Sequence, residues 1–354
     1  MEEVVGSDTL QKKLIQQGYL RVKKYDWKVS ALQLHTLIHK HYIKPSICLN
    51  NPYIERNSAI ERIEEIKNYL LRYNIRLTAS HLGAFITDVA SNFPIIKPSK
   101  KRIFFDISSI IVDDHKSGIQ RVTRAIINSS FNFTHQDYDF IFVYSRPNCT
   151  DFFIANSYLF NNQLIESKSI DEKVDFLAGD ILFFLDFHPS LIIKNKLNIA
   201  KLRNNRIKVY HLLHDILPLQ LPQFFWTEMI EEFNEWLLAS AHSDGFICVS
   251  KTVTKELKNY LALAVPNNTH ELKIGFIHNG ADFESSLSTK GVDEDVLQRL
   301  YSLEGDIKFL MVGTLEPRKG HTAILKVFNL LWSKGYQYNL IIVGRLGWNM
   351  KHVA

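Results

Sequence analysis

The sequence contains few cysteines and no long apolar run. It has 3 cysteines in 354 residues, and their number and spacing fit neither a disulfide framework nor a zinc site. The N-terminus lacks the basic segment and apolar core of a secretory signal peptide. No uncharged apolar stretch approaches the ~20 residues that span a bilayer. These absences argue against a disulfide-rich secreted protein and an integral membrane protein, and they predict a cytoplasmic protein.

Several nucleotide-binding and hydrolytic signatures are also missing. The sequence has no G-x-x-x-x-G-K-[ST] phosphate-binding loop, no G-x-S-x-G nucleophile elbow and no G-x-G-x-x-G turn after its first strand pattern. Its aromatic residues are not interleaved with basic runs, as they are in platforms for single-stranded nucleic acid. P-loop NTPases, serine hydrolases, dinucleotide oxidoreductases and nucleic-acid-binding proteins are therefore disfavoured. The net charge of +5 fits an anionic partner or an ordinary solvated surface equally well.

Length and patterning predict more than one domain. A chain of 354 residues exceeds a typical single core. Residues 8–43 have apolar positions at helical spacing, with an interruption near Gly18, and we expect a helical tail over residues 1–45. Two proline-containing stretches flank an amphipathic helix pattern, which predicts a helical connector over residues 46–101.

From residue 102 onwards, apolar strands alternate with amphipathic helices. This alternation is typical of a parallel sheet that is covered by helices on both faces. We therefore predict an α/β fold with a doubly wound, Rossmann-like sheet over residues 102–290. A polar stretch follows, and the alternation restarts over residues 300–354. A doubly wound domain usually needs ~100 residues or more, so we expect this second domain to be incomplete.

One strand-to-helix turn, "GTLEPRKG", combines glycine, proline and two adjacent cations. Ligands of open parallel sheets bind beyond the carboxyl ends of the strands, and a helix N-terminus attracts phosphate groups. Arg318 and Lys319 therefore predict a diphosphate site, in which the guanidinium binds in bidentate fashion and the ammonium acts as a compact charge. The alternative is an exposed Arg-Lys pair in an ordinary loop.

Two further strand ends have candidate residues. In "DISSIIVDDHKSGIQRVTR", Gly118 opens a helix that carries Arg121, and this glycine would let an anion approach the backbone. A helix that begins there without a ligand is the equal alternative. In "HLLHDILP", His214 and Asp215 end an apolar strand and suggest an active-site rim, although Asp215 could instead cap the next element. His211 lies three residues before His214, on the opposite face of the strand, which argues against a metal pair.

Together, the motifs "SGIQRVTR", "HDILPLQLP", "DGFICVSKTVTKEL", "IGFIHNGAD" and "FLMVGTLEPRKGH" resemble those of the family 4 (group 1) retaining GT-B glycosyltransferases. The likeness is greatest to mannosyltransferase-like enzymes of O-antigen and capsular polysaccharide synthesis, and it extends over residues 102–354. The resemblance implies two Rossmann-like domains facing a cleft, a nucleotide-sugar donor and a saccharide acceptor. It places His214, with Asp215 beside it, near the reacting sugar. It places the donor diphosphate on Gly118, Arg121, Gly313, Arg318 and Lys319.

By the same resemblance, the reaction is the transfer of a sugar with retention, with GDP-mannose as the first-choice donor and a lipid-linked saccharide as the acceptor. Cations would stabilise the departing diphosphate, so no metal and no further cofactor are expected. No nucleic acid is expected as a partner. The basic run "KPSKKR" suits a peripheral contact with the cytoplasmic face of the inner membrane, or a solvated linker.

The sequence departs from the family pattern at two places. Thr314 occupies a position where many relatives have an arginine, so Arg318 would contribute more of the phosphate binding. The family's E-x7-E carboxylates follow the last motif, and this chain has none of them. The N-terminal segment with Trp27, Ser30 and Ala31 resembles the closing helices of another GT-B transferase, or is an unrelated helical hairpin. We therefore expect an interior fragment of a tandem transferase, with little or no activity on its own.

Two other functions fit the same residues. A degenerate transferase domain would act as a saccharide-binding or assembly module without catalysis. A regulatory nucleotide-binding protein of Rossmann type would bind free nucleotide without any dependence on sugar, and the fold by itself does not separate it from an enzyme.

Overall fold

The structure is a computed structural model that describes residues 8–22, 29–30, 33–34, 37, 78, 100–115, 117–131, 136–146, 149–265, 272–281, 293–303 and 307–348. Nearly all of the predicted connector over residues 46–101, and the residues Trp27 and Ala31, lie outside this part. Contacts divide the chain into two compact units. The first comprises residues 1–220 and 228–286, and the second comprises residues 221–227 and 287–354.

The first unit contains a seven-stranded sheet in the order β3-β2-β1-β4-β5-β6-β7. Only β3 is antiparallel to its neighbour, and every other pair is parallel. The predicted α/β class with a Rossmann-like sheet is confirmed. The strands are β1 (Lys101–Asp106), β2 (Tyr138–Ser145), β3 (Phe152–Ile154), β4 (Ile181–Phe184), β5 (Lys208–Leu213), β6 (Gly245–Cys248) and β7 (Lys273–Phe276).

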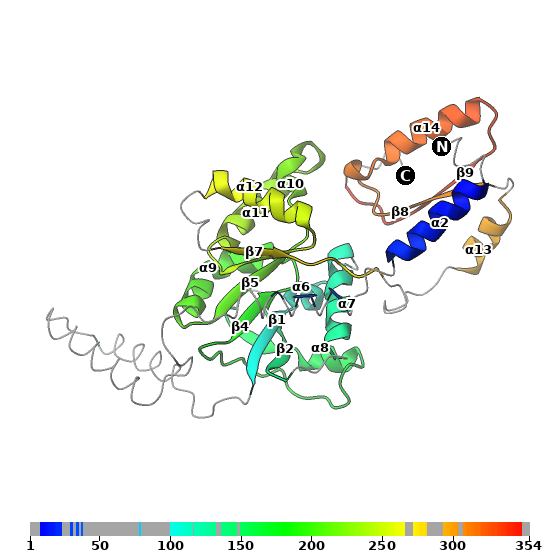
Figure 1. Ribbon diagram of the computed structural model, residues 1–354. Helices are drawn as coiled ribbons and strands as arrows, with labels where there is room; N and C mark the ends of the chain where they lie inside the picture. The colour runs from blue at the N-terminus through cyan, green and yellow to red at the C-terminus, as the bar shows by residue number, and fades with distance from the viewer. Residues whose placement is uncertain are drawn as a thin grey trace. The chain divides into compact units, whose positions relative to one another are not determined.

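Helices cover both faces of this sheet (Figure 1). Helices α7 and α8 contribute to the core on one face, and helices α9, α11 and α12 contribute to the core on the other. Helix α12 begins at Ser250, whose Oγ accepts a hydrogen bond from Val253 N at 3.2 Å, as the N-cap pattern predicts. The helices are α6 (Ser108–Val112), α7 (Gly118–Phe131), α8 (Asn156–Asn161), α9 (Pro189–Asn204), α10 (Leu217–Gln220), α11 (Thr227–Ser240) and α12 (Lys251–Ala264).

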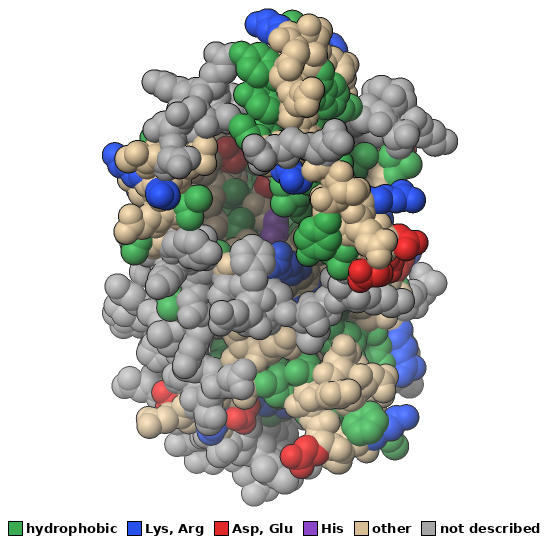
Figure 2. Space-filling model, turned by 90° about the vertical axis from the view of Figure 1, so that its right-hand side faces the viewer, with side chains coloured by type: hydrophobic (Ala, Val, Ile, Leu, Met, Phe, Trp, Pro, Cys, Tyr) green, Lys and Arg blue, Asp and Glu red, His purple; other side chains and the backbone are tan. Residues whose placement is uncertain are grey.

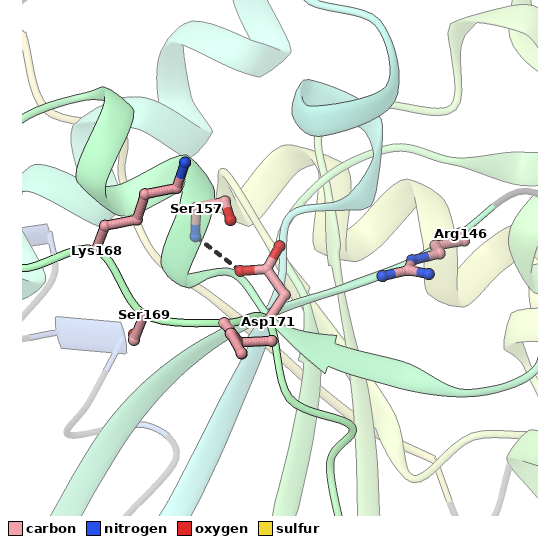
Figure 3. Close-up of a pocket in the computed structure, with 6 residues that line it drawn as sticks. Arg146, Ser157, Lys168, Ser169 and Asp171 are labelled. Atoms are coloured by element: carbon pink, nitrogen blue, oxygen red, sulfur yellow. Dashed lines mark hydrogen bonds between the residues drawn. The ribbon is translucent and has the colours of Figure 1, made fainter.

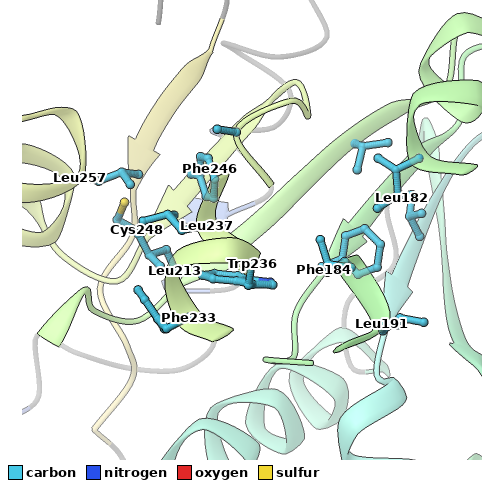
Figure 4. Packing of buried hydrophobic residues seen from close by; sticks show 14 of the residues in the cluster. Leu182, Phe184, Leu191, Leu213, Phe233, Trp236, Leu237, Phe246, Cys248 and Leu257 are labelled. Carbon is cyan, nitrogen blue, oxygen red and sulfur yellow. The ribbon is translucent and has the colours of Figure 1, made fainter. Parts of the chain in front are cut away.

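Alternation along the strands separates two cores. In β1, Phe105 packs with the core under α7, whereas Phe104 packs with the core under α9, because successive side chains of a strand point to opposite faces. Figure 4 shows the second core, in which Trp236 and Phe246 meet the side chains of β4 and β5. Each such side chain contributes roughly 1.5–3 kcal/mol when fully buried, so the sheet is held from both sides.

The N-terminal helical prediction is confirmed for α2 (Asp8–Val22). The interruption that we expected at Gly18 is wrong, since α2 continues through it. A helix tolerates one glycine at a cost of about 1 kcal/mol. Further along, Leu34 is 2% exposed and belongs to the core under α7. A residue of the predicted helical tail is therefore part of the first unit's core.

The second unit has a parallel pair of strands, β8 (Lys308–Val312) and β9 (Asn339–Val343), joined by η3 (Pro317–Lys319) and α14 (His321–Ser333). Helix α13 (Glu294–Tyr301) precedes them, and η2 (Pro222–Phe224) also belongs to this unit. The predicted strand-helix-strand order is confirmed. Phe328 of α14 packs against Phe309, with ring centroids 5.3 Å apart. On the other face of β8, Leu310 is 66% exposed and Val312 is 71% exposed.

On the face drawn in Figure 2, basic and hydrophobic side chains are intermixed, and the basic ones are scattered rather than gathered into one patch. Within the described ranges, no helix has both the length and the apolar character required to cross a bilayer.

Candidate functional site

The carboxyl edge of the seven-stranded sheet is the first candidate site. The chain runs from β1 to β2 on one side, and then returns to place β4 on the other side of β1. Ligands of doubly wound sheets bind at such a switch point, beyond the carboxyl ends of the strands. Asp106 ends β1 and Asp186 follows β4, so two carboxyl groups lie at the switch point.

Asp106 connects the ends of β1 and β2. Its Oδ2 accepts a hydrogen bond of 2.5 Å from Ser108 Oγ, and the same Ser108 oxygen accepts a bond of 2.8 Å from Ser145 N at the end of β2. Asp106 is fully buried, and burial raises its pKa to about 7. The Ser108 hydroxyl opposes that rise, and the nearby Asp186 adds to it.

Asp186 connects β4 to the turn after β1. Its Oδ2 accepts a hydrogen bond from Ile110 N at 2.7 Å, and its Oδ1 accepts one from Phe187 N at 3.0 Å. Burial raises the pKa of this carboxyl to about 6. We did not select either aspartate from the sequence. Each directly ends an apolar strand run, "RIFFD" and "ILFFLD", and that pattern is the signal that could have identified them.

The turn at Gly118 is built as a capping box. Ser117 Oγ accepts from Gln120 N and Gln120 Oε1 accepts from Ser117 N, both at 3.2 Å. This reciprocal pair satisfies helix N-terminal donors, and Gln120 Nε2 also donates to Asp113 O at 2.7 Å. In the described part of the chain, no hydrogen bond is found for the N–H groups of Gly118 and Ile119. The pattern S-x-x-Q was readable in the sequence, and we missed it.

Gly118 itself is not required by the local backbone. A Cβ added there would meet nothing within 4 Å, and the residue is exposed at the first position of α7. Arg121 is exposed one turn further on. Arg124 forms an ion pair of 2.8 Å with Asp114. The open space above Gly118 is compatible with an approaching ligand, and its assignment to a diphosphate stays a prediction.

His214 and Asp215 follow β5 and have different surroundings. Asp215 Oδ1 accepts from Leu217 N at 3.1 Å, so this carboxylate holds the start of α10, which is the capping role that we considered. His214 Nε2 is buried and makes no hydrogen bond with the described residues. Burial lowers the pKa of His214 to about 4, and its ring is therefore neutral at pH 7. A buried neutral imidazole can still bond a ligand hydroxyl.

His211 is a core residue. Its Nε2 lies 2.8 Å from Ser243 Oγ, and its ring stacks on Phe184 with a centroid distance of 4.8 Å. Burial lowers the pKa of His211 to about 3. The described residues contain no group of three side chains that could hold a metal ion.

The turn between β8 and α14 is the second candidate site. Its backbone is held against the segment after β9, because Gly313 N donates to Val343 O at 2.9 Å and Leu315 N donates to Arg345 O at 2.8 Å. Position 344 requires glycine because the backbone of Gly313 passes close to it: a Cβ added there would lie 1.8 Å from Gly313 O. Gly320 has a φ of 78°, in the left-handed region that favours glycine, and it turns the chain into α14.

The two cations of this turn have unequal surroundings. Arg318 Nη2 lies 2.7 Å from Oε1 of Glu316 in the same turn, and Glu316 is 2% exposed. Lys319 is exposed, and no ion pair or hydrogen bond of its ammonium is found in the described part of the chain. Lys319 is thus the more available cation, and the guanidinium is held in place by a buried carboxylate. The assignment of both cations, and of Gly313, to a diphosphate stays a prediction.

His321 is a further unusual residue of this unit. It is the first residue of α14 and is fully buried. Neither ring nitrogen has a hydrogen-bond partner among the described residues. A buried polar atom without a partner costs about 1–3 kcal/mol. We did not select His321 from the sequence, where one histidine after a glycine gave no signal.

Comparison with known proteins shows which proteins the segment around this turn resembles. Residues 293–353 match the family model described as glycosyl transferases group 1. This match covers the second unit's strands, helix and cation-bearing turn. No solved structure gives a significant match. Residues 293–353 are therefore similar to group 1 glycosyltransferases, in agreement with the resemblance inferred from the motifs.

Curated relatives give a more specific description of the proteins that this chain resembles. Three proteins named serotype-specific mannosyltransferase WbdA, from Escherichia coli, are similar to the chain. They are 33%, 35% and 32% identical over 266, 262 and 266 residues, which is 72% of this chain in each case. The aligned part is 31%, 31% and 30% of the relatives, so the chain spans about a third of their length. The predicted resemblance to mannosyltransferase-like group 1 enzymes is confirmed.

Proposed function

We propose that this chain is part of a retaining glycosyltransferase that transfers mannose from a nucleotide sugar to a saccharide acceptor in cell-surface polysaccharide synthesis. The observation that carries the proposal is the similarity of 72% of the chain to mannosyltransferases, at 33% identity. The group 1 match over residues 293–353 supports it. GDP-mannose is the proposed donor, and a lipid-linked saccharide at the cytoplasmic face of the inner membrane is the proposed acceptor.

The donor diphosphate would bind at the turn before α14. Lys319 is exposed there, and the helix that follows has the positive end of its dipole at this turn. As the bond between the anomeric carbon and the phosphate oxygen breaks, negative charge grows on the diphosphate. The Lys319 ammonium and the Arg318 guanidinium would stabilise that charge, in place of a metal ion. Glu316 would orient the guanidinium, since it lies 2.7 Å from Arg318 Nη2.

The acceptor side would be formed at the carboxyl edge of the seven-stranded sheet. His214 has a buried neutral ring with an unpartnered Nε2 within the described residues. That nitrogen is suited to a hydroxyl of the reacting sugar, because pairing would remove the cost of leaving it unsatisfied. Asp215 would act indirectly, by holding the loop after β5 through Leu217 N.

The test is mannosyl transfer by the full polypeptide that carries this sequence. GDP-mannose is supplied with a lipid-linked acceptor, and Lys319→Ala is compared with wild type and with Lys326→Ala, which removes an exposed lysine from α14. Lys319→Ala should lower kcat/KM by about tenfold or more, equivalent to about 1.4 kcal/mol of transition-state stabilisation. Lys326→Ala should have no effect.

Two outcomes contradict the proposal in different ways. Unchanged turnover of Lys319→Ala would remove the diphosphate assignment while leaving the transferase intact. Wild-type protein that binds saccharide but transfers no sugar from any nucleotide donor would support the saccharide-binding module instead.

A further inference from the structure

An open pocket lies beside β2 and β3, near the edge of the seven-stranded sheet that β3 forms (Figure 3). Its volume is about 530 Å³, within the range of about 300–1,000 Å³ that is typical of small-ligand sites. None of its lining residues was selected from the sequence. The pocket is lined by Arg146, Ser157, Lys168, Ser169, Ile170 and Asp171.

Asp171 is held in a fixed position in this pocket. Its Oδ1 accepts a hydrogen bond of 2.7 Å from Ser157 N, and its Oδ2 accepts one of 3.0 Å from Tyr144 OH. The loop that carries it is also anchored, because Asn156 Nδ2 donates to Ile170 O at 2.9 Å. A carboxylate has about four acceptor positions, so these two bonds leave capacity for a ligand. The group is preorganised, which reduces the entropy cost of binding.

Two cations lie on opposite sides of this carboxylate in Figure 3. The Arg146 guanidinium lies 4.3 Å from the centroid of the Phe153 ring, a cation–π contact that orients it. Lys168 extends from the exposed loop. In the described part of the chain no ion pair of either cation is found. Arg146 interacts with the Tyr144 hydroxyl, and its remaining N–H donors and the Lys168 ammonium are available to a ligand.

The mixture of groups identifies the class of ligand. A phosphate would meet two cations but also the central carboxylate of Asp171, which repels it. A neutral polyhydroxylated ligand would use every group, because its hydroxyls donate to Asp171 and accept from Arg146 and Lys168. Ile170 is 81% exposed and offers an apolar contact for the C–H face of a sugar ring. Neutral saccharide fits the pocket better than an anion.

One residue of the pocket lining, Arg146, lies at the carboxyl edge of the same sheet. Arg146 directly follows β2, and β2 is paired with β1, one strand spacing of about 4.8 Å away. Tyr158 follows Ser157 in α8, and its phenol lies in the electrostatic field of Arg124, Asp114 and Asp186 at the switch point. A saccharide with one end at the switch point would therefore extend over β2 toward the pocket.

From this geometry, we infer that the pocket beside β2 and β3 is a subsite for an inner, neutral part of the acceptor saccharide, away from the sugar that receives the new bond. The inference rests on the proposed function for the identity of the acceptor. Arg146, Lys168 and Asp171 bind the hydroxyls, and the subsite favours long acceptors over short ones.

The test uses the full polypeptide, with mannotetraose, mannobiose and inorganic phosphate as probes in a direct binding titration. The double variant Arg146→Ala/Lys168→Ala removes donors and keeps both groups that donate to Asp171, Ser157 N and Tyr144 OH, although the Tyr144 hydroxyl loses its interaction with Arg146. Lys251→Ala removes an exposed lysine from the start of α12 as a control. The double variant should bind mannotetraose about tenfold more weakly, and its preference for mannotetraose over mannobiose should fall by the same factor. The control should match wild type.

Three other outcomes would each contradict a different claim: the existence of the subsite, the class of its ligand, or the proposed function. Equal mannotetraose binding by wild type and the double variant, with both folded by circular dichroism, removes the subsite. Phosphate that binds here and competes with mannotetraose removes the neutral-saccharide assignment. Failure of mannosyl transfer to every acceptor counts against the proposed function alone, since loss of mannotetraose binding in the double variant would still establish the subsite.

Discussion

Asp106 and Asp186 place two buried carboxyl groups at the ends of neighbouring strands, and burial raises the pKa of both. A carboxyl whose folded pKa is raised binds its proton more tightly in the native state than in the unfolded chain. Its contribution to stability is therefore fully present below its unfolded pKa, near 3.8, and is lost as pH rises through about 7 for Asp106. His211 and His214, with lowered pKa values, change stability in the opposite direction, so a variant is needed to isolate the aspartate.

Asp106→Asn provides that variant. The amide keeps an oxygen that can accept the Ser108 hydrogen bond, and it cannot ionise. Relative to wild type, the variant should gain up to about 1.4 kcal/mol of unfolding free energy per pH unit between pH 5 and pH 7. Urea unfolding of both proteins across this range is the measurement. Parallel stability curves would show that Asp106 is ionised in the native state throughout.

At the scale of single residues, the sequence indicates candidate site residues more readily than it indicates the residues that bond to them. Arg318, Lys319 and His214 are recognisable because they occur where strand patterns stop. The pairing of Asp106 with the β2 end, through Ser108, depends on β1 lying between β2 and β4, and that order is not written in the sequence. The Glu316–Arg318 ion pair likewise requires the shape of the turn.

At the scale of elements, the glycine after β9 and the glycine at the start of α7 differ in the space around them. Gly344→Ala would place a methyl group 1.8 Å from Gly313 O and should destabilise the second unit by at least about 2 kcal/mol. Gly118→Ala meets nothing within 4 Å and should leave stability unchanged or raise it slightly. Thermal unfolding of the two variants, followed by far-UV circular dichroism, compares them directly.

The Gly118 variant also separates the two interpretations of that turn. If a donor phosphate approaches the N–H groups at the start of α7, Gly118→Ala should raise the donor KM severalfold in a fully folded protein. If the turn is a plain helix entry, its KM should equal that of wild type. A loss of stability on Gly118→Ala would contradict the geometry of the open space above this residue.

Strand patterns predict most of the elements correctly, for a physical reason. Parallel strands covered on both faces are continuous apolar runs, and β1, β4 and β6 are such runs. The three-residue β3 was not predicted, because an edge strand of that length has no distinguishable periodicity. The capping box of Ser117 and Gln120 was present as a pattern but was not used.

At the scale of the whole molecule, the two units differ in how much core they contain. The first has a seven-stranded sheet with two buried cores. The described part of the second has a two-stranded sheet, with Leu310 and Val312 exposed on one face. Small sheets with an exposed apolar face are only marginally stable.

Hydrogen exchange should therefore distinguish the units. In the full polypeptide, amides of β8 and β9 should exchange at least about tenfold faster than those of β4, β5 and β6, because opening the smaller core costs less free energy. Exchange followed by mass spectrometry resolves peptides from each strand. Equal protection in both units would mean that the exposed face of β8 is covered in solution.

The turn that carries Lys319 takes its shape from a distant part of the chain. Backbone bonds from Gly313 and Leu315 reach Val343 and Arg345, and Gly347 N returns a bond to Leu315 O at 2.9 Å. Neutral substitutions after β9 would therefore shift the cations without altering any charge. An attempt to change donor preference by substituting only charged residues would therefore overlook the segment after β9, which determines the position of Arg318 and Lys319.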